Sequence, residues 1–148
     1  MIKHITALVF LSASAQSFAA TDLAPFPFDP AQLAGSWAES YDTGVACRPE
    51  NVKSTLALSA GGKRLEIHLD RKTKTELGGG ETDQIGASVL WATQRTIVIR
   101  YDGEARKKKS GQPVEWELAI VAPGVYRWRE TEWRAGAVNT VVGIRCSR

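Results

Sequence analysis

Residues 114–133 read VEWELAIVAPGVYRWRETEW, and this stretch decides the fold class. Apolar side chains alternate with polar or small ones up to Ile120, and a second alternating run follows the Pro123-Gly124 turn. A period of two places successive side chains on opposite faces, as in a β-strand with one buried face. Two such runs separated by a short turn predict an antiparallel hairpin.

The same alternation recurs along the chain. Further alternating runs lie at residues 55–58, 64–70, 97–101 and 138–144, with Gly-rich or Asp-rich turns between them. No helical stretch long enough for a crossover separates these runs, so consecutive strands should pair antiparallel. The pattern predicts an all-β fold, an up-and-down meander of about eight or nine strands closing into a small barrel. A two-sheet sandwich is the alternative.

The N-terminal residues predict export. Lys3 and His4 begin a segment whose residues 5–13 are almost wholly apolar, and Ser17-Phe18-Ala19 has the small residues of a signal peptidase site. The apolar run is shorter than the roughly 20 residues that a membrane-spanning helix needs. We therefore expect a signal peptide over 1–19, no membrane span, and a periplasmic or secreted protein.

The remaining chain divides into an arm and a barrel. Residues 20–34 contain Pro25, Pro27 and Pro30, which exclude a helix or a central strand over most of the segment. We expect a Pro-rich lead-in arm over 20–34, ending in one short helical turn capped by Asp29, and a barrel domain over 35–148.

Two cysteines are present, Cys47 and Cys146. An exported protein with an even number of cysteines is expected to pair them, although two unpaired buried thiols are the alternative. The bridge would join the two ends of the meander, which a closed barrel brings together.

Charge and residue types argue against several function classes. A formal net charge of +3 is mild and does not indicate nucleic acid. The dense basic run Arg106 to Lys109 is predicted as a solvated loop tip, with attraction to an acidic partner or an anionic membrane surface as the alternative.

The residues expected in the exported chain offer little for catalysis. His68 is the one histidine beyond the signal segment, and it shares the polar face of its strand, which predicts a surface residue rather than a base. Gly78-Gly79-Gly80 lacks the strand-to-helix context of a phosphate loop. We expect no enzyme activity, no cofactor and no metal site.

Aromatic residues are the more informative group. Strict alternation after Val125 puts Tyr126 and Trp128 on one face and Arg127 and Arg129 on the other. We expect the rings inside, because two buried arginines would need two partners that the pattern does not provide. The reverse register would enclose the arginines and favour an anionic ligand. With rings inside, the predicted ligand-binding wall consists of Trp116, Leu118, Tyr126 and Trp128.

Leu33-Ala34-Gly35-Ser36-Trp37 before a strand resembles the opening of the lipocalin-like calycins, whose Gly-x-Trp begins the first barrel strand. In that group an arginine from the end of the barrel packs across the tryptophan, and Arg145 is the matching residue here. The resemblance implies that Gly35, Trp37 and Arg145 are structural. The same phrase is similar to the opening of small barrel inhibitors that bacteria export to block proteases.

Two functions follow as expectations. The first is an exported lipocalin-like binding protein for an apolar or amphipathic small molecule. The alternative is an interaction or inhibitor module that uses the arm or the basic loop against another envelope protein.

Overall fold

A computed structural model describes residues 28–40, 46–75, 77, 80–134 and 140–146. The predicted signal peptide and most of the predicted arm, to residue 27, lie outside the described residues. A single turn of 3-10 helix, η1 (Pro30–Leu33), precedes the strands, and Asp29 caps it by accepting a hydrogen bond from the Ala31 backbone N–H. The predicted short helical turn and its cap are confirmed.

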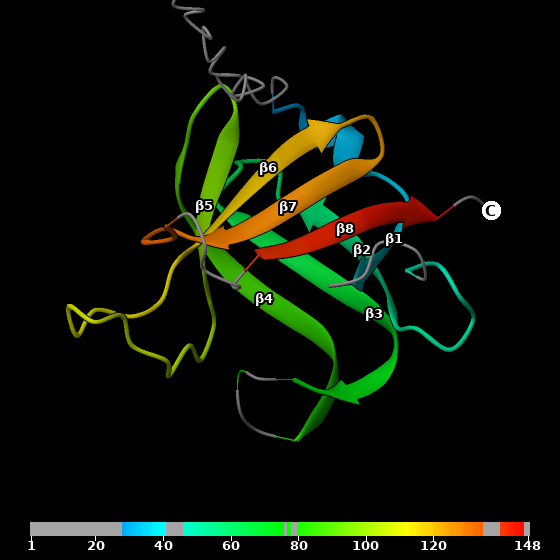
Figure 1. The fold of residues 1–148 in the computed structure, drawn as a ribbon, viewed down its shortest axis with the longest axis horizontal. Coiled ribbons are helices and arrows are strands. Elements are labelled where there is room, and N and C mark those ends of the chain that lie inside the picture. The colour runs from blue at the N-terminus through cyan, green and yellow to red at the C-terminus, as the bar shows by residue number, and fades with distance from the viewer. Residues whose placement is uncertain (1–27, 41–45, 76, 78–79, 135–139, 147–148) are drawn as a thin grey trace, which may run out of the picture.

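The strands follow in the order predicted for a meander (Figure 1). They are β1 (Ser36–Ser40), β2 (Lys53–Leu58), β3 (Arg64–Lys74), β4 (Glu81–Ala92), β5 (Thr96–Tyr101), β6 (Trp116–Ala122), β7 (Val125–Glu130) and β8 (Thr140–Cys146). Each pairs antiparallel with the next, and β1 pairs with β8. This last pairing closes the sheet into an eight-stranded barrel, which decides between the predicted barrel and the sandwich.

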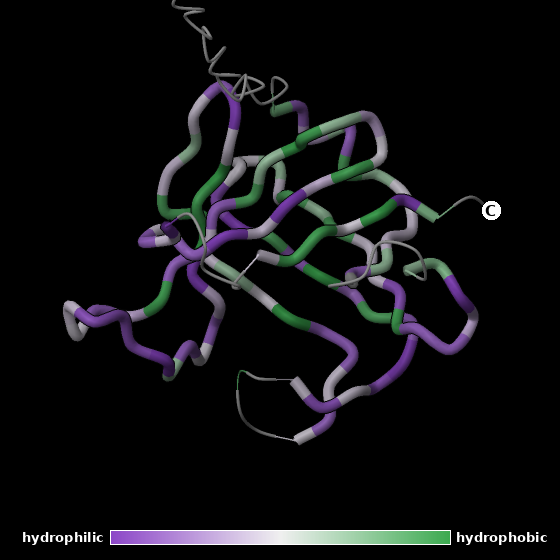
Figure 2. Tube along the Cα trace, viewed as in Figure 1, coloured by the Kyte–Doolittle hydropathy of each residue, from purple (hydrophilic) through white to green (hydrophobic). Residues whose placement is uncertain are grey.

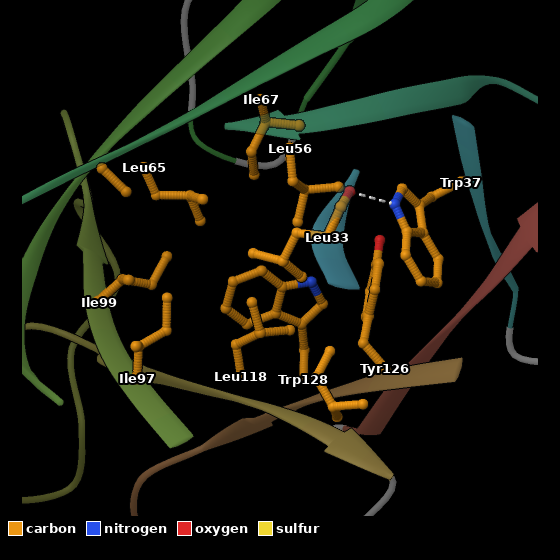
Figure 3. Close-up of a cluster of buried hydrophobic side chains, with 12 residues drawn as sticks. Leu33, Trp37, Leu56, Leu65, Ile67, Ile97, Ile99, Leu118, Tyr126 and Trp128 are labelled. Atoms are coloured by element: carbon orange, nitrogen blue, oxygen red, sulfur yellow. Dashed lines mark hydrogen bonds between the residues drawn. The ribbon is translucent and has the colours of Figure 1, made fainter. Parts of the chain in front are cut away.

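The hairpin that predicted the fold has the expected register. Leu118 lies opposite Trp128, and Ile120 lies opposite Tyr126. These four side chains are buried in the core, so the rings point inward as predicted. Figure 3 shows Tyr126 and Trp128 projecting from β7 into the cluster that contains Leu33, Leu56 and Ile99. Arg127 faces outward and lies 3.6 Å from Glu117.

One end of the barrel is closed by η1 and by the end of β8. Trp37 is fully buried, and its indole N–H donates to the Leu33 carbonyl oxygen at 2.7 Å (Figure 3). The Arg145 guanidinium lies 4.9 Å from the centre of the Trp37 ring and donates to the Gln32 carbonyl oxygen. The predicted pairing of Trp37 with Arg145 is confirmed.

The disulfide between Cys47 and Cys146 is also confirmed, across a separation of 99 residues. Cys146 lies opposite Ser36 in the β1–β8 pair, so the bridge fastens the loop after β1 to the strand that closes the barrel.

Two parts of the chain extend from the opposite end. The β3–β4 hairpin and the loop from 102 to 115 project beyond the barrel body (Figure 1). The loop and the ends of β3 and β4 that lead to their connection are largely hydrophilic, whereas apolar residues are concentrated along the barrel strands (Figure 2). No helix among the described residues is long and apolar enough to cross a membrane.

Candidate functional site

The open end of the barrel holds a cavity of about 220 Å³, here called the mouth cavity. Its wall combines aromatic, aliphatic and a few polar side chains, as ligand pockets do. The lining residues are Glu39, Thr75, Leu77, Ile85, Tyr101, Arg106, Trp116, Trp128 and Val141. They come from β1, β4, β5, β6, β7 and β8 and from segments that follow β3 and β5, so the closed sheet brings distant parts of the chain together.

Glu39 is the polar centre of the mouth cavity. It lies two residues after the buried Trp37 on β1, so strand alternation turns its side chain toward the interior. The Tyr126 hydroxyl donates to Glu39 Oε1 at 2.8 Å, and the Trp128 indole N–H donates to the same oxygen at 3.0 Å. The three side chains form a connected polar group above the apolar core.

The position of Glu39 alters its acidity. The residue as a whole is exposed, while its carboxylate borders the mouth cavity and accepts hydrogen bonds from two largely buried side chains. Desolvation of the carboxylate raises the pKa of Glu39, and the hydrogen bonds from Tyr126 and Trp128 oppose the rise without cancelling it. Burial also raises the pKa of Tyr101 and of Tyr126, and the nearby Glu39 charge adds to both shifts. Both phenols are therefore neutral donors at ordinary pH.

An ion pair between Arg106 and Glu104 lies at the rim of the mouth cavity. Arg106 donates from Nε to Glu104 Oε1 and from Nη2 to Oε2, both at 2.7 Å. Burial favours the neutral form of Glu104, but the hydrogen bonds from the Arg106 side chain and backbone outweigh it and lower the pKa of Glu104. The Arg106 guanidinium also lies 5.4 Å from the centre of the Trp116 ring. The rim arginine is thus neutralised by Glu104 and fixed against an aromatic face.

The predicted ligand-binding wall divides between two levels. Trp116 and Trp128 line the mouth cavity. Leu118 and Tyr126 are fully buried in the core beneath it, where Tyr126 contacts the Trp37 ring at 4.8 Å between ring centres. Tyr126 reaches the cavity indirectly, through its hydroxyl on Glu39.

The predicted basic loop tip differs from the structure at two positions. Lys107 and Lys109 are exposed as expected, but Arg106 and Lys108 are half-buried. Lys108 donates to Glu115 at 2.8 Å and to the Thr131 hydroxyl at 2.8 Å. The four basic residues therefore alternate between solvent and the protein, because Lys107 forms an isolated β-bridge with Pro113 that gives this segment an extended backbone.

Seven of the lining residues lie outside the predicted wall: Glu39, Thr75, Leu77, Ile85, Tyr101, Arg106 and Val141. Glu39 and Arg106 are the charged ones. The signal for Glu39 was present, since it follows the Gly-x-Trp at an inward position of the same strand. Its partners, however, lie 87 and 89 residues away in the sequence. His68 is exposed, as predicted, and does not line the mouth cavity.

Among the described residues there is no group of three or more His, Cys, Asp or Glu side chains that could hold a metal ion. The mouth cavity offers one carboxylate, neutral hydroxyl and indole donors, and three large rings. Such a lining can enclose an apolar body and fix one polar group.

No protein-family model matches the chain, and no curated protein matches it. The eight-stranded antiparallel barrel is compatible with a lipocalin-like fold.

Proposed function

We propose that the protein is an exported, lipocalin-like binding protein that takes an apolar or amphipathic small molecule into the mouth cavity. The observation that carries the proposal is the composition of the cavity, in which rings and aliphatic side chains surround the polar group at Glu39, with Thr75 and Arg106 as the other polar lining residues. Small-molecule sites have this composition, and the mouths of β-barrels are a common place for them.

The two ends of the barrel support the lipocalin-like assignment. Arg145 over Trp37 is the arrangement that the calycin resemblance implies, and it closes one end while the other stays open. The Cys47–Cys146 disulfide supports export, since disulfides persist in oxidising compartments.

The test is binding of a neutral fluorescent amphiphile, N-phenyl-1-naphthylamine, to the exported protein and to two variants. Val141 lines the mouth cavity on β8, and Val142 is the next residue, on the outer face. Val141→Phe should fill the cavity and weaken binding about tenfold or more, whereas Val142→Phe should leave it within about twofold. Equal effects of the two substitutions, or no binding by the unmodified protein, would contradict the proposal.

A second candidate, an interaction module for another envelope protein, rests on Trp91. Among the described residues, this β4 residue is the large hydrophobic side chain that is exposed, with 49% of its surface accessible. Aromatic residues are enriched at protein interfaces. If this function holds, Trp91→Ala should abolish capture of a specific envelope partner, and Val141→Phe should not.

A further inference from the structure

We propose that the ligand of the mouth cavity carries an organic ammonium group, which Glu39 binds together with the rings of Tyr101, Trp116 and Trp128. This inference rests on the binding function proposed above and names the class of its ligand.

The first argument is the arrangement of hydrogen bonds on the carboxylate. Both donors, Tyr126 Oη and Trp128 Nε1, reach Oε1 of Glu39. Within the described part of the chain, no residue donates to Oε2. A carboxylate has roughly four lone-pair sites, so about half of the accepting capacity of this cavity-lining residue has no donor among the described residues. A ligand that approaches Glu39 therefore meets an acceptor without a matching donor.

The second argument is the charge of the lining. Two charged side chains of the described residues border the mouth cavity, the cationic Arg106 and the anionic Glu39. Arg106 is already paired through two hydrogen bonds with the buried Glu104 carboxylate. The charge left over is the negative charge of Glu39, so the lining attracts a cation and repels a ligand carboxylate or phosphate.

The third argument is the aromatic wall. The Tyr101 and Trp128 rings lie 6.3 Å apart between centres, and Trp116 completes the aromatic part of the lining. Aromatic faces attract alkylammonium groups, and the attraction is larger where water is excluded. The wall also provides the apolar contact that an alkyl chain needs.

An organic cation fits these residues better than a metal ion. Calcium takes about six to eight oxygen ligands, and magnesium needs about six in octahedral geometry. The structure offers one carboxylate here, and the described residues form no metal-binding group elsewhere in the cavity.

Binding of a cation should be coupled to release of a proton from the Glu39 carboxyl group. Desolvation raises the pKa of Glu39 in the empty cavity, and a bound cation would lower it again by its charge. Among the described residues, the other titratable or charged groups near Glu39 are Tyr126, Tyr101, Glu104 and Arg106. The two phenols have raised pKa values and Glu104 a lowered one, so none of these groups changes charge between about pH 5 and 8. Of the described groups, Glu39 is therefore the one whose charge a change of affinity in that range would report.

The experiment compares three probes with the same alkyl chain by calorimetry. They are hexyltrimethylammonium chloride, 1-hexanol and sodium hexanoate, each below its aggregation limit. We expect the ammonium probe to bind at least about tenfold more tightly than hexanoate, with hexanol between them. Its affinity should rise as the pH rises through the raised pKa of Glu39, while that of hexanol should stay constant.

The matched variants are Glu39→Gln and Glu117→Gln. Both remove one negative charge, but Glu117 faces outward on β6 beside Arg127. Glu39→Gln should weaken ammonium binding about tenfold and leave hexanol within about twofold, while Glu117→Gln should change neither. If Glu39→Gln does not fold, the order of affinities among the three probes for the unmodified protein decides.

The outcomes separate this inference from the proposed function. Hexanol or hexanoate binding as tightly as the ammonium probe would overturn the ammonium assignment and leave the binding function standing. The ammonium assignment would also be overturned if Glu39→Gln bound all three probes as tightly as the unmodified protein does. If none of the three probes bound, both the ammonium assignment and the proposed binding function would be contradicted.

Discussion

Trp37 is the residue on which the closed end of the barrel depends. Its ring is fully buried between Tyr126 and Arg145, and its indole N–H is satisfied by the Leu33 carbonyl. Trp37→Ala should lower the free energy of unfolding by about 3 to 5 kcal/mol, as truncation of a large core aromatic does. Urea denaturation measures the loss. Trp91→Ala, at an exposed position, is the control and should stay within about 0.5 kcal/mol. Similar losses for both variants would refute the assigned role of Trp37.

Glu39 gives a prediction about how the stability of the protein depends on pH. Its pKa is raised in the folded protein above the ordinary value of 4.5, so the folded state holds its proton at pH values where the unfolded state has released it. Stability from this residue therefore falls as pH rises from the unfolded pKa to the folded one. Glu39→Gln keeps an acceptor for Tyr126 and Trp128 but does not titrate. The unfolding free energy of Glu39→Gln minus that of the unmodified protein should increase with pH across this window, measured by denaturant titration. A difference that is constant with pH would show that Glu39 is not desolvated.

At the scale of the element, β8 must pass beneath the Tyr126 ring. Gly143 lies opposite both Tyr126 and Glu39 in the sheet, and a Cβ atom there would come within 2.1 Å of Tyr126 Cζ. Gly143→Ala should displace the ring and cost about 1 to 3 kcal/mol, the usual range for overpacking. Thermal unfolding by circular dichroism measures it. Gly61→Ala is the control, because no atom lies within 4 Å of its added Cβ. If Gly143→Ala is as stable as the control, the packing of Tyr126 on β8 is wrong.

The elements also show what the sequence could predict. The β6–β7 hairpin followed from alternation, and its inward face followed from the cost of burying Arg127 and Arg129 without partners. Both were confirmed because they depend on local period and on burial. The hydrogen-bonded group at Glu39 could not be predicted. Glu39 lies on the five-residue strand β1, whereas its donors come from β7, and β8 lies between these two strands in the sheet. Such a contact depends on barrel closure, which the local pattern of one strand does not contain.

For the whole molecule, the Cys47–Cys146 disulfide adds to the closure made by β1 and β8. It encloses a loop of 99 residues in sequence separation, and the chain-entropy model assigns about 4 to 5 kcal/mol to a loop of this size. The double variant Cys47→Ser with Cys146→Ser should lose stability toward that value by urea denaturation. A loss below about 1 kcal/mol would mean that strand pairing alone fixes the closure, and equal masses of reduced and non-reduced protein after thiol alkylation would refute the bridge.

The central claim is that one end of the barrel is closed while the mouth cavity at the other end binds a ligand. The chain has five tryptophans, and four of them report separately on the closed end, the exposed surface and the mouth cavity. Trp37 lies at the closed end, Trp91 is exposed, and Trp116 and Trp128 line the mouth cavity. The most direct measurement is the indole N–H region of a ¹⁵N-labelled NMR spectrum during titration with hexyltrimethylammonium. The account predicts saturable shifts of Trp116 and Trp128 with Trp37 and Trp91 unchanged; shifts confined to Trp91, or no saturable shift of either cavity tryptophan, would contradict it.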